Sequence, residues 1–127
     1  MARSPGHQKW PNHKVQEHPV RVRMRVELDG EVLAESQDVI RVDEDNHPTR
    51  FYFPRSAVNM ARLQRSTSTS ECPFKGLARY FNLSAGSTSL ADAVWSYEQP
   101  YDEHRTLAER LAFYDDRYPQ IKVSQSS

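Results

Sequence analysis

The chain has 127 residues, in which 17 Lys and Arg balance 17 Asp and Glu. This length supports one hydrophobic core, and the balanced charge disfavours nucleic-acid binding, which usually shows as clustered basic excess. There is no apolar run of the roughly 18 to 20 residues that cross a bilayer, and no apolar leader follows Met1. With a single cysteine, the composition predicts one soluble, cytoplasmic domain without membrane or nucleic-acid partners.

The first 18 residues contain few aliphatic side chains and are rich in His, Lys, Gln and Asn. Such a segment buries too little apolar surface to offset the entropy of ordering it, so residues 1–18 are predicted to form a flexible tail. His7, His13 and His18 lie in this segment without helical spacing or a carboxylate partner. A solvated tail is therefore favoured over a metal site.

Apolar residues alternate with Arg and Glu from Val20 to Leu28, which is the period of a half-buried strand. Asp29 and Gly30 follow, and this pair suits the positive φ angles of a tight hairpin turn. Residues 31–36 are predicted to form the returning strand. The sequence therefore predicts a β-hairpin over residues 20–36.

Short apolar runs predict further strands at residues 39–42, 50–53, 77–83, 93–97, 113–114 and 120–123. Helical spacing predicts two turns over residues 56–63 and a short helix after Asp102, whereas the Ser/Thr cluster at 66–70 is predicted to interrupt regular structure. The pattern predicts a mainly β fold, a small antiparallel domain over residues 19–123 with one or two short helices, and a polar end at 124–127.

The segment from Cys72 to Gly76 combines a thiol, an ammonium group and an aromatic ring between proline and glycine. Lys75 would lower the pKa of Cys72 and make the thiol nucleophilic, whereas free cysteine is otherwise a small buried apolar residue. A nucleophile also needs a base, which His47 or His104 would have to supply from elsewhere in the chain. Both interpretations of Cys72 remain open.

Aromatic residues predict the walls of a pocket. Trp95 and Tyr97 lie two apart on a predicted strand and therefore share a face. Tyr52 lies in the aromatic run before Pro54. Aromatic side chains supply core area in a small β-domain, and one face of them also suits a planar ligand.

Two cations accompany these aromatic motifs. Arg55 can bind an anion with its planar fork and Lys75 as a point charge, and the alternative is an ion pair with the acidic turn at residues 43–45. The predicted ligand-binding residues are Tyr52, Arg55, Cys72, Lys75, Trp95 and Tyr97.

Four ordered motifs resemble those of a known family. They are GEVLAES at 30–36, YFPR at 52–55, CPFKG at 72–76 followed by ARY at 78–80, and AVWSY at 93–97 with AFY at 112–114. In this order, over residues 20–123, they resemble the family catalogued as domain of unknown function 427. The resemblance implies a β-tent or barrel-like fold of antiparallel strands with a pocket lined by the motif residues.

The nucleotidyltransferase-like label sometimes attached to this family finds no support in these residues. Metal-dependent nucleotidyl transfer is expected to use paired acidic residues on a strand after a Gly-Ser pair, and the sequence has no such pattern. The chain also carries Ser56 and Ala57 where the family tends to show Glu-Asp.

Three functions are compatible with these patterns. The leading one is a pocket for a small anionic or planar ligand, with no cofactor and no metal. The second is a small-molecule enzyme that uses Cys72 as nucleophile or redox thiol, with Arg55 holding substrate charge. The third is a protein-interaction module that uses the edge of the first hairpin, where Arg21, Arg23 and Arg25 form a basic stripe. The sequence specifies neither the ligand nor the oligomeric state.

Overall fold

A computed structural model describes residues 3–126 of the chain, which form a mainly β, antiparallel fold as predicted. One short helix, α1 (Pro5–Lys9), and three 3-10 segments, η1 (Arg55–Ala57), η2 (Met60–Arg62) and η3 (Asp102–Leu107), accompany the strands. The strands are β1 (Val15–Val20), β2 (Met24–Leu28), β3 (Glu31–Ser36), β4 (Val39–Glu44), β5 (Arg50–Tyr52), β6 (Leu63–Cys72), β7 (Gly76–Ala85), β8 (Thr88–Tyr97), β9 (Leu111–Phe113) and β10 (Ile121–Gln125).

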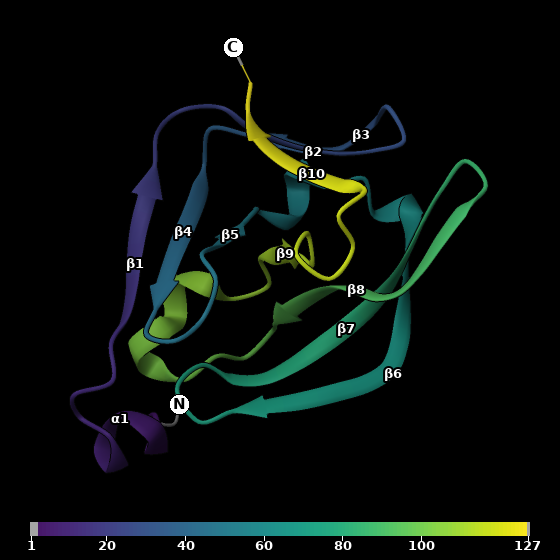
Figure 1. Cartoon of the computed structure of the whole chain (residues 1–127). Helices are drawn as coiled ribbons and strands as arrows, with labels where there is room; N and C mark the ends of the chain where they lie inside the picture. Colours follow the sequence, from purple (N-terminus) through teal and green to yellow (C-terminus); the bar gives the residue numbers. More distant parts are fainter. Residues whose placement is uncertain (1–2, 127) are drawn as a thin grey trace.

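The strands form three antiparallel sheets, with the orders β1-β4-β5, β10-β2-β3 and β6-β7-β8-β9. In Figure 1 these sheets stand as three walls, with β1 and β4 on the left, β2, β3 and β10 across the top and β6 to β8 along the lower right. An isolated bridge between Phe53 and Leu111 joins the first and third sheets. Over residues 3–126 the three sheets do not close into a single barrel.

The first hairpin has the turn that its sequence predicts. Asp29 and Gly30 have φ angles of 52° and 82°, and β2 pairs with β3 on either side of them. Both positive angles give the turn a twist that matches the flanking strands. Val26 and Leu28 are fully buried, as the alternation of the sequence requires.

The predicted strand from residue 20 to 28 is divided in the structure, so its N-terminal half was wrongly predicted. Val20 ends β1 in the first sheet, whereas Met24 begins β2 in the second. Val22 lies between them and is exposed. The chain turns a corner here, and alternation alone does not reveal that two halves of one pattern join different sheets.

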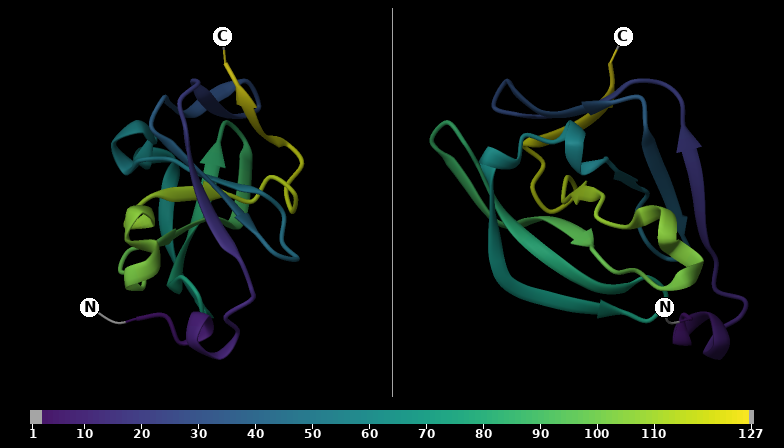
Figure 2. Two further views of the ribbon diagram at one scale, coloured as in Figure 1. Left: turned by 90° about the vertical axis from the view of Figure 1, so that its left-hand side faces the viewer. Right: turned by 180° about the vertical axis from the view of Figure 1, so that it is seen from behind.

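Residues before 19 differ from the expected tail. β1 pairs with β4 along residues 15–20, and the backbone nitrogen of Gly6 donates a hydrogen bond to the carbonyl of Pro73 at 2.7 Å. Ser4 and Gly6 are buried. The segment is poor in aliphatic side chains, but backbone hydrogen bonds hold it in place. Amino-acid composition does not reveal such bonds, so the prediction of a tail was wrong for these residues. In the right view of Figure 2, purple α1 lies at the lower end of the molecule.

Three further segments depart from the sequence predictions. The Ser/Thr cluster at 66–70 lies within β6, an edge strand with mostly exposed side chains, where such residues are tolerated. The expected helix over 56–63 is split into η1 and η2, and between them the backbone nitrogen of Asn59 binds the carbonyl of Leu33. The short helix predicted after Asp102 is a 3-10 segment, η3, which ends at Leu107.

The buried side chains form two clusters. The larger one has members from β2, β3, β7, β8, β9 and β10 and includes Phe53, Leu83 and Phe113. The smaller one lies beside the first sheet and contains Ile40, Val42, Tyr52, Ala78, Trp95, Tyr97, Leu107 and Ala112. Its exposed margin forms the candidate site. Within the described residues, no helix has the length and apolar character needed to cross a membrane.

Candidate ligand-binding site

A cavity of about 380 Å³ opens between the end of the first sheet and the hairpin formed by β6 and β7. Its aromatic lining consists of Tyr52, Phe74, Tyr80, Trp95, Tyr97 and Tyr114. Its polar lining includes Glu44, His47, Arg50, Glu71, Cys72 and Lys75. Of the six residues predicted to bind a ligand, five border this cavity, and Arg55 does not.

The pairing of residues on neighbouring strands determines which aromatic side chains form the cavity wall. Tyr80 on β7 lies directly opposite Trp95 on β8, and Tyr52 on β5 pairs with Ile40 on β4. The indole nitrogen of Trp95 donates a hydrogen bond of 3.1 Å to the hydroxyl oxygen of Tyr52. Tyr97 also borders the cavity, so the prediction that it shares a face with Trp95 is confirmed. Two sheets thus contribute to one wall.

Arg50 and Tyr114 complete the wall. The Tyr114 ring lies 4.6 Å from the Trp95 ring and stacks on Tyr80 at 6.5 Å, with 13° between the planes. The guanidinium of Arg50 lies 5.0 Å from the centre of the Trp95 ring and 5.2 Å from that of Tyr114. Arg50 also donates to Asp116 at 2.7 Å. This cation is therefore held by aromatic faces and by a carboxylate.

Two phenols of the wall are neutral and resist ionisation. Burial raises the pKa of Tyr52 and of Tyr97 well above the ordinary value, because an anionic phenolate would lose its hydration there. Neutral hydroxyl groups donate and accept hydrogen bonds. The wall therefore offers aromatic area together with polar groups that carry no charge.

Lys75 and Glu44 form a buried ion pair at the polar end of the cavity. The ammonium group of Lys75 donates to Oε1 of Glu44, and each side chain is less than one-tenth exposed. Nε2 of His13 lies 3.0 Å from Oε2 of the same carboxylate. Burial opposes ionisation of Glu44, but the hydrogen bonds from Lys75 and His13 outweigh it and lower the pKa of this carboxyl. Lys75 is thus paired with the acidic turn, which was one of its two predicted roles.

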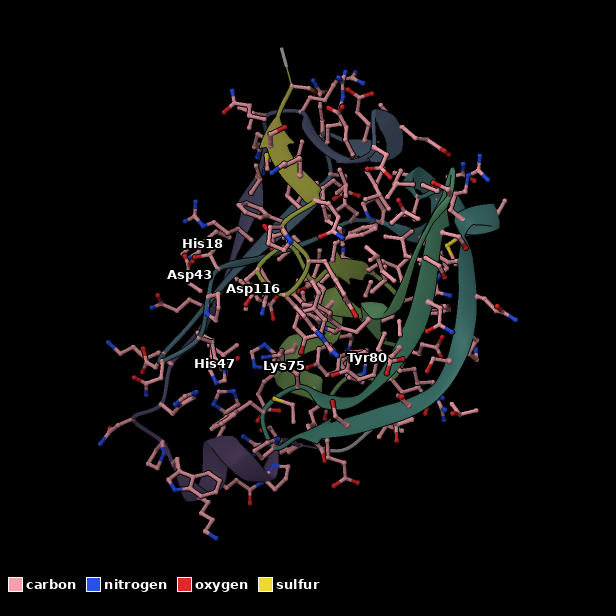
Figure 3. All side chains as sticks on the ribbon, turned by 45° about the vertical axis from the view of Figure 1, so that its right-hand side comes forward. His18, Asp43, His47, Lys75, Tyr80 and Asp116 are labelled. Atoms are coloured by element: carbon pink, nitrogen blue, oxygen red, sulfur yellow. The ribbon has the colours of Figure 1, made fainter. Side chains whose placement is uncertain are left out.

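Cys72 is half-buried and borders the cavity at the end of β6. The nearby ammonium of Lys75 binds Glu44. His104, one of the two candidate bases, binds Oε2 of Glu17 at 2.5 Å and Nε2 of His7 at 2.9 Å. His47, the other, borders the cavity. Figure 3 shows Lys75 between His47 and Tyr80 in its view.

Arg55 lies in a different cluster. Its guanidinium donates to the carbonyl of Glu109 at 3.1 Å and to the hydroxyl of Ser96 at 3.2 Å, and it lies 3.5 Å from Oε2 of Glu98. These contacts tie η1 to the end of β8. Arg55 does not line the aromatic cavity, because its guanidinium binds Ser96, which alternates with Trp95 and Tyr97 along β8.

Several lining residues were not among those predicted. Tyr80 and Tyr114 lie in the family-like motifs but were not among the six predicted ligand-binding residues, and Arg50 was predicted only as part of a strand. Strand alternation carried a partial signal, since Arg50 and Tyr52 are two apart and share a face. Glu44 was predicted only as part of the acidic turn that could pair with a cation, and its position beside Lys75 depends on contacts between distant segments.

Comparison with proteins of curated function gives no match. Residues 16–124 match the family described as Domain of unknown function (DUF427), and this match covers nearly the whole described chain. It includes the strands that line the cavity, from Glu44 to Tyr114. The match agrees with the motif resemblance, and the chain belongs to the DUF427 family.

Proposed function

We propose that the chain binds a small, planar, polar molecule in the cavity between the β4–β5 and β6–β7 connections. The observation that carries the proposal is one cavity lined by six aromatic side chains and a buried ion pair. Its volume of about 380 Å³ lies within the range of small-molecule sites. The ring of such a ligand would stack on the wall, while its polar edge would reach Glu44, Lys75 and the phenols.

The charges favour a planar ligand over a simple anion. Both cations at the cavity already have carboxylate partners, Lys75 with Glu44 and Arg50 with Asp116. An anion would have to compete with these carboxylates, and the buried one is costly to leave unpaired. A planar ring instead gains contact with aromatic faces without breaking either pair.

Tryptophan fluorescence tests the proposal. The chain has two tryptophans, and Trp10 lies outside this cavity and is exposed. The variant Trp10→Phe leaves Trp95 as the only reporter, in the cavity wall. We expect saturable quenching by benzamide, with cyclohexanecarboxamide binding up to about tenfold more weakly, because the two share a polar group and only benzamide is flat.

Two tyrosine variants locate the binding. Tyr80→Ala in the same background removes a stacking ring and should weaken binding of benzamide about tenfold. Tyr118→Ala is the matched control, because Tyr118 lies outside the cavity lining. Equal affinity for the flat and puckered probes, or an equal loss in both variants, would contradict the proposal.

Alkylation of Cys72 provides a second measurement of ligand binding in the same cavity. Because its half-buried thiol borders the same space, a bound ligand should slow alkylation of Cys72 by iodoacetamide. The concentration of benzamide that gives half-protection should match the fluorescence midpoint. Protection at a different concentration would place the ligand elsewhere.

A further inference from the structure

Three potential metal ligands converge at the end of β4. Nε2 of His13 lies 3.0 Å and Nε2 of His47 lies 3.5 Å from Oε2 of Glu44. All three ligand atoms lie within 4.8 Å of one another. His13 comes from the segment before β1, and His47 from the turn between β4 and β5. Two imidazoles and one carboxylate are a donor set typical of divalent transition metals.

We propose that Nε2 of His13, Oε2 of Glu44 and Nε2 of His47 bind one divalent transition metal ion of the Zn²⁺ class. Glu44 and His47 also border the aromatic cavity, so a fourth coordination position would face that space. Three protein ligands with an open position are typical of zinc sites that bind a water or another small ligand. The site does not depend on the planar ligand proposed above.

The separations of the ligand atoms support this assignment. Zinc bonds to imidazole nitrogen and carboxylate oxygen are about 2.0–2.2 Å long, so two ligand atoms of a tetrahedral site lie about 3.3 Å apart. The observed separations of 3.0 and 3.5 Å from Glu44 bracket that value. His47 is more than half exposed on its turn, so its ring is free to move toward His13, whose ligand atom lies within 4.8 Å of its own.

Neighbouring groups hold two of the ligands in place. The ring of His13 stacks on Phe74 at 4.3 Å, with 19° between the planes. Lys75 donates to Oε1 of Glu44, which leaves Oε2 directed at the two imidazoles. Supporting contacts of this kind orient metal ligands before the metal arrives.

The charge of Lys75 acts against the metal. Its ammonium shares Glu44 with the proposed ion, and the two cations repel each other. We therefore expect affinity below that of a zinc site whose carboxylate has no other cation.

The test uses protein without a histidine tag and the metal alone. Competition against a chromophoric chelator measures the affinity for Zn²⁺, and the visible absorption of Co²⁺ reports the coordination number. The variants His13→Gln and His47→Gln each remove one imidazole. His18→Gln is the matched control, because His18 lies on β1, beside Asp43 and apart from His47 (Figure 3).

We expect one Zn²⁺ per chain and a loss of at least about tenfold in affinity for both His13→Gln and His47→Gln, but none for His18→Gln. Thermal melts without metal establish that each variant is folded. Zn²⁺ should raise the melting temperature of the wild-type chain and not that of the variant that carries both His13→Gln and His47→Gln. Binding that survives both substitutions, or falls equally in His18→Gln, would overturn the proposal.

Discussion

Glu44 accepts hydrogen bonds from two side chains that are each 31 residues away in the sequence, Lys75 and His13. One carboxylate thus joins the end of β4 to the β6–β7 hairpin and to the N-terminal segment. Removal of either partner leaves a charge in a space where water no longer solvates it fully. The pair therefore stabilises the site as well as giving it polarity.

Lys75→Met should lower the free energy of unfolding by about 2 kcal/mol. Breaking a buried pair typically costs about 3–5 kcal/mol, and the loss here is smaller because Glu44 keeps His13 as a partner. Urea denaturation measures it as a lower midpoint with an unchanged slope. The double variant with Glu44→Gln should lose less than the sum of the two single variants, because neither charge is then left alone.

An exposed ion pair provides the control for this prediction. Arg62 lies 2.6 Å from Glu31, and the two side chains are 44% and 30% exposed, far more than those of Lys75 and Glu44. Arg62→Met should cost less than about 1 kcal/mol, because water screens such pairs. Equal losses in Lys75→Met and Arg62→Met would mean that burial does not set the strength of the Glu44–Lys75 pair.

At the level of elements, the N-terminal segment docks on the β6–β7 hairpin through its backbone. Gly6 lies against Pro73 and Phe74, and an added Cβ at this position would lie 2.7 Å from the Pro73 carbonyl oxygen. The hydroxyl of Ser4 donates to the same carbonyl at 2.7 Å. A glycine is thus required by close approach of two backbones.

Gly6→Ala should release the N-terminal segment while the sheets remain folded. Overpacking of this kind costs about 1–3 kcal/mol, so local opening should become at least about fivefold more frequent. Limited trypsin digestion measures this as faster cleavage after Lys9 and Lys14. Gly30→Ala is the control, since an added Cβ there meets no atom within 4 Å and the strain falls on a distant turn. Unchanged cleavage in Gly6→Ala would contradict the docking.

These elements also show how far the sequence predicts the fold. Strands with a clear alternation or apolar run, such as β2 and β8, were predicted because their side chains carry the signal of burial. β1 was not predicted because backbone pairing with β4 holds it in place, while its side chains are mostly polar or partly exposed and show no burial pattern. The Ser/Thr part of β6 was missed for the same reason, since an edge strand needs few apolar residues.

At the scale of the whole molecule, a hydrogen-bonded pair of histidines connects the N-terminal segment to the rest of the fold. His7 and His104 share a hydrogen bond of 2.9 Å between their Nε2 atoms, and His104 also binds Glu17 on β1. Such a bond requires at least one of the two facing nitrogens to be unprotonated. Burial and the neighbouring His104 lower the pKa of His7, and the weaker influences of Glu103, His13 and Glu44 do not reverse this direction.

The stability of the chain should therefore fall as pH decreases below about 6.5, the ordinary histidine pKa. In that window the unfolded state takes up a proton on His7 that the native state resists, so the free energy of unfolding rises with pH. The pKa of Glu17 is also lowered, since hydrogen bonds from His104 and Thr106 together outweigh burial. The stabilisation that ionised Glu17 provides is lost as the pH falls further, so Glu17 also makes the free energy of unfolding rise with pH.

Urea unfolding between about pH 5 and pH 7.5 measures this dependence. His7→Gln removes the titrating group and keeps a polar side chain, so its stability should change less over that range. His18→Gln, at an exposed position on the outer edge of β1, should keep the wild-type profile. A wild-type profile that is flat from pH 5 to 7.5 would contradict the assignment.

By itself, the sequence determined the mainly β class, the Asp29-Gly30 hairpin and the aromatic wall of Tyr52, Trp95 and Tyr97. Each of these follows from local periodicity or from the backbone preferences of adjacent residues. The motifs in their order also identified the family.

Only the tertiary structure decided how the charged groups are used. It paired Lys75 with Glu44, placed Arg55 outside the cavity and brought His13 to His47. The physical reason is that charge interactions and metal coordination depend on separations of a few ångströms between segments that lie far apart in the sequence. Those separations are set by how the three sheets pack together, which no local pattern encodes.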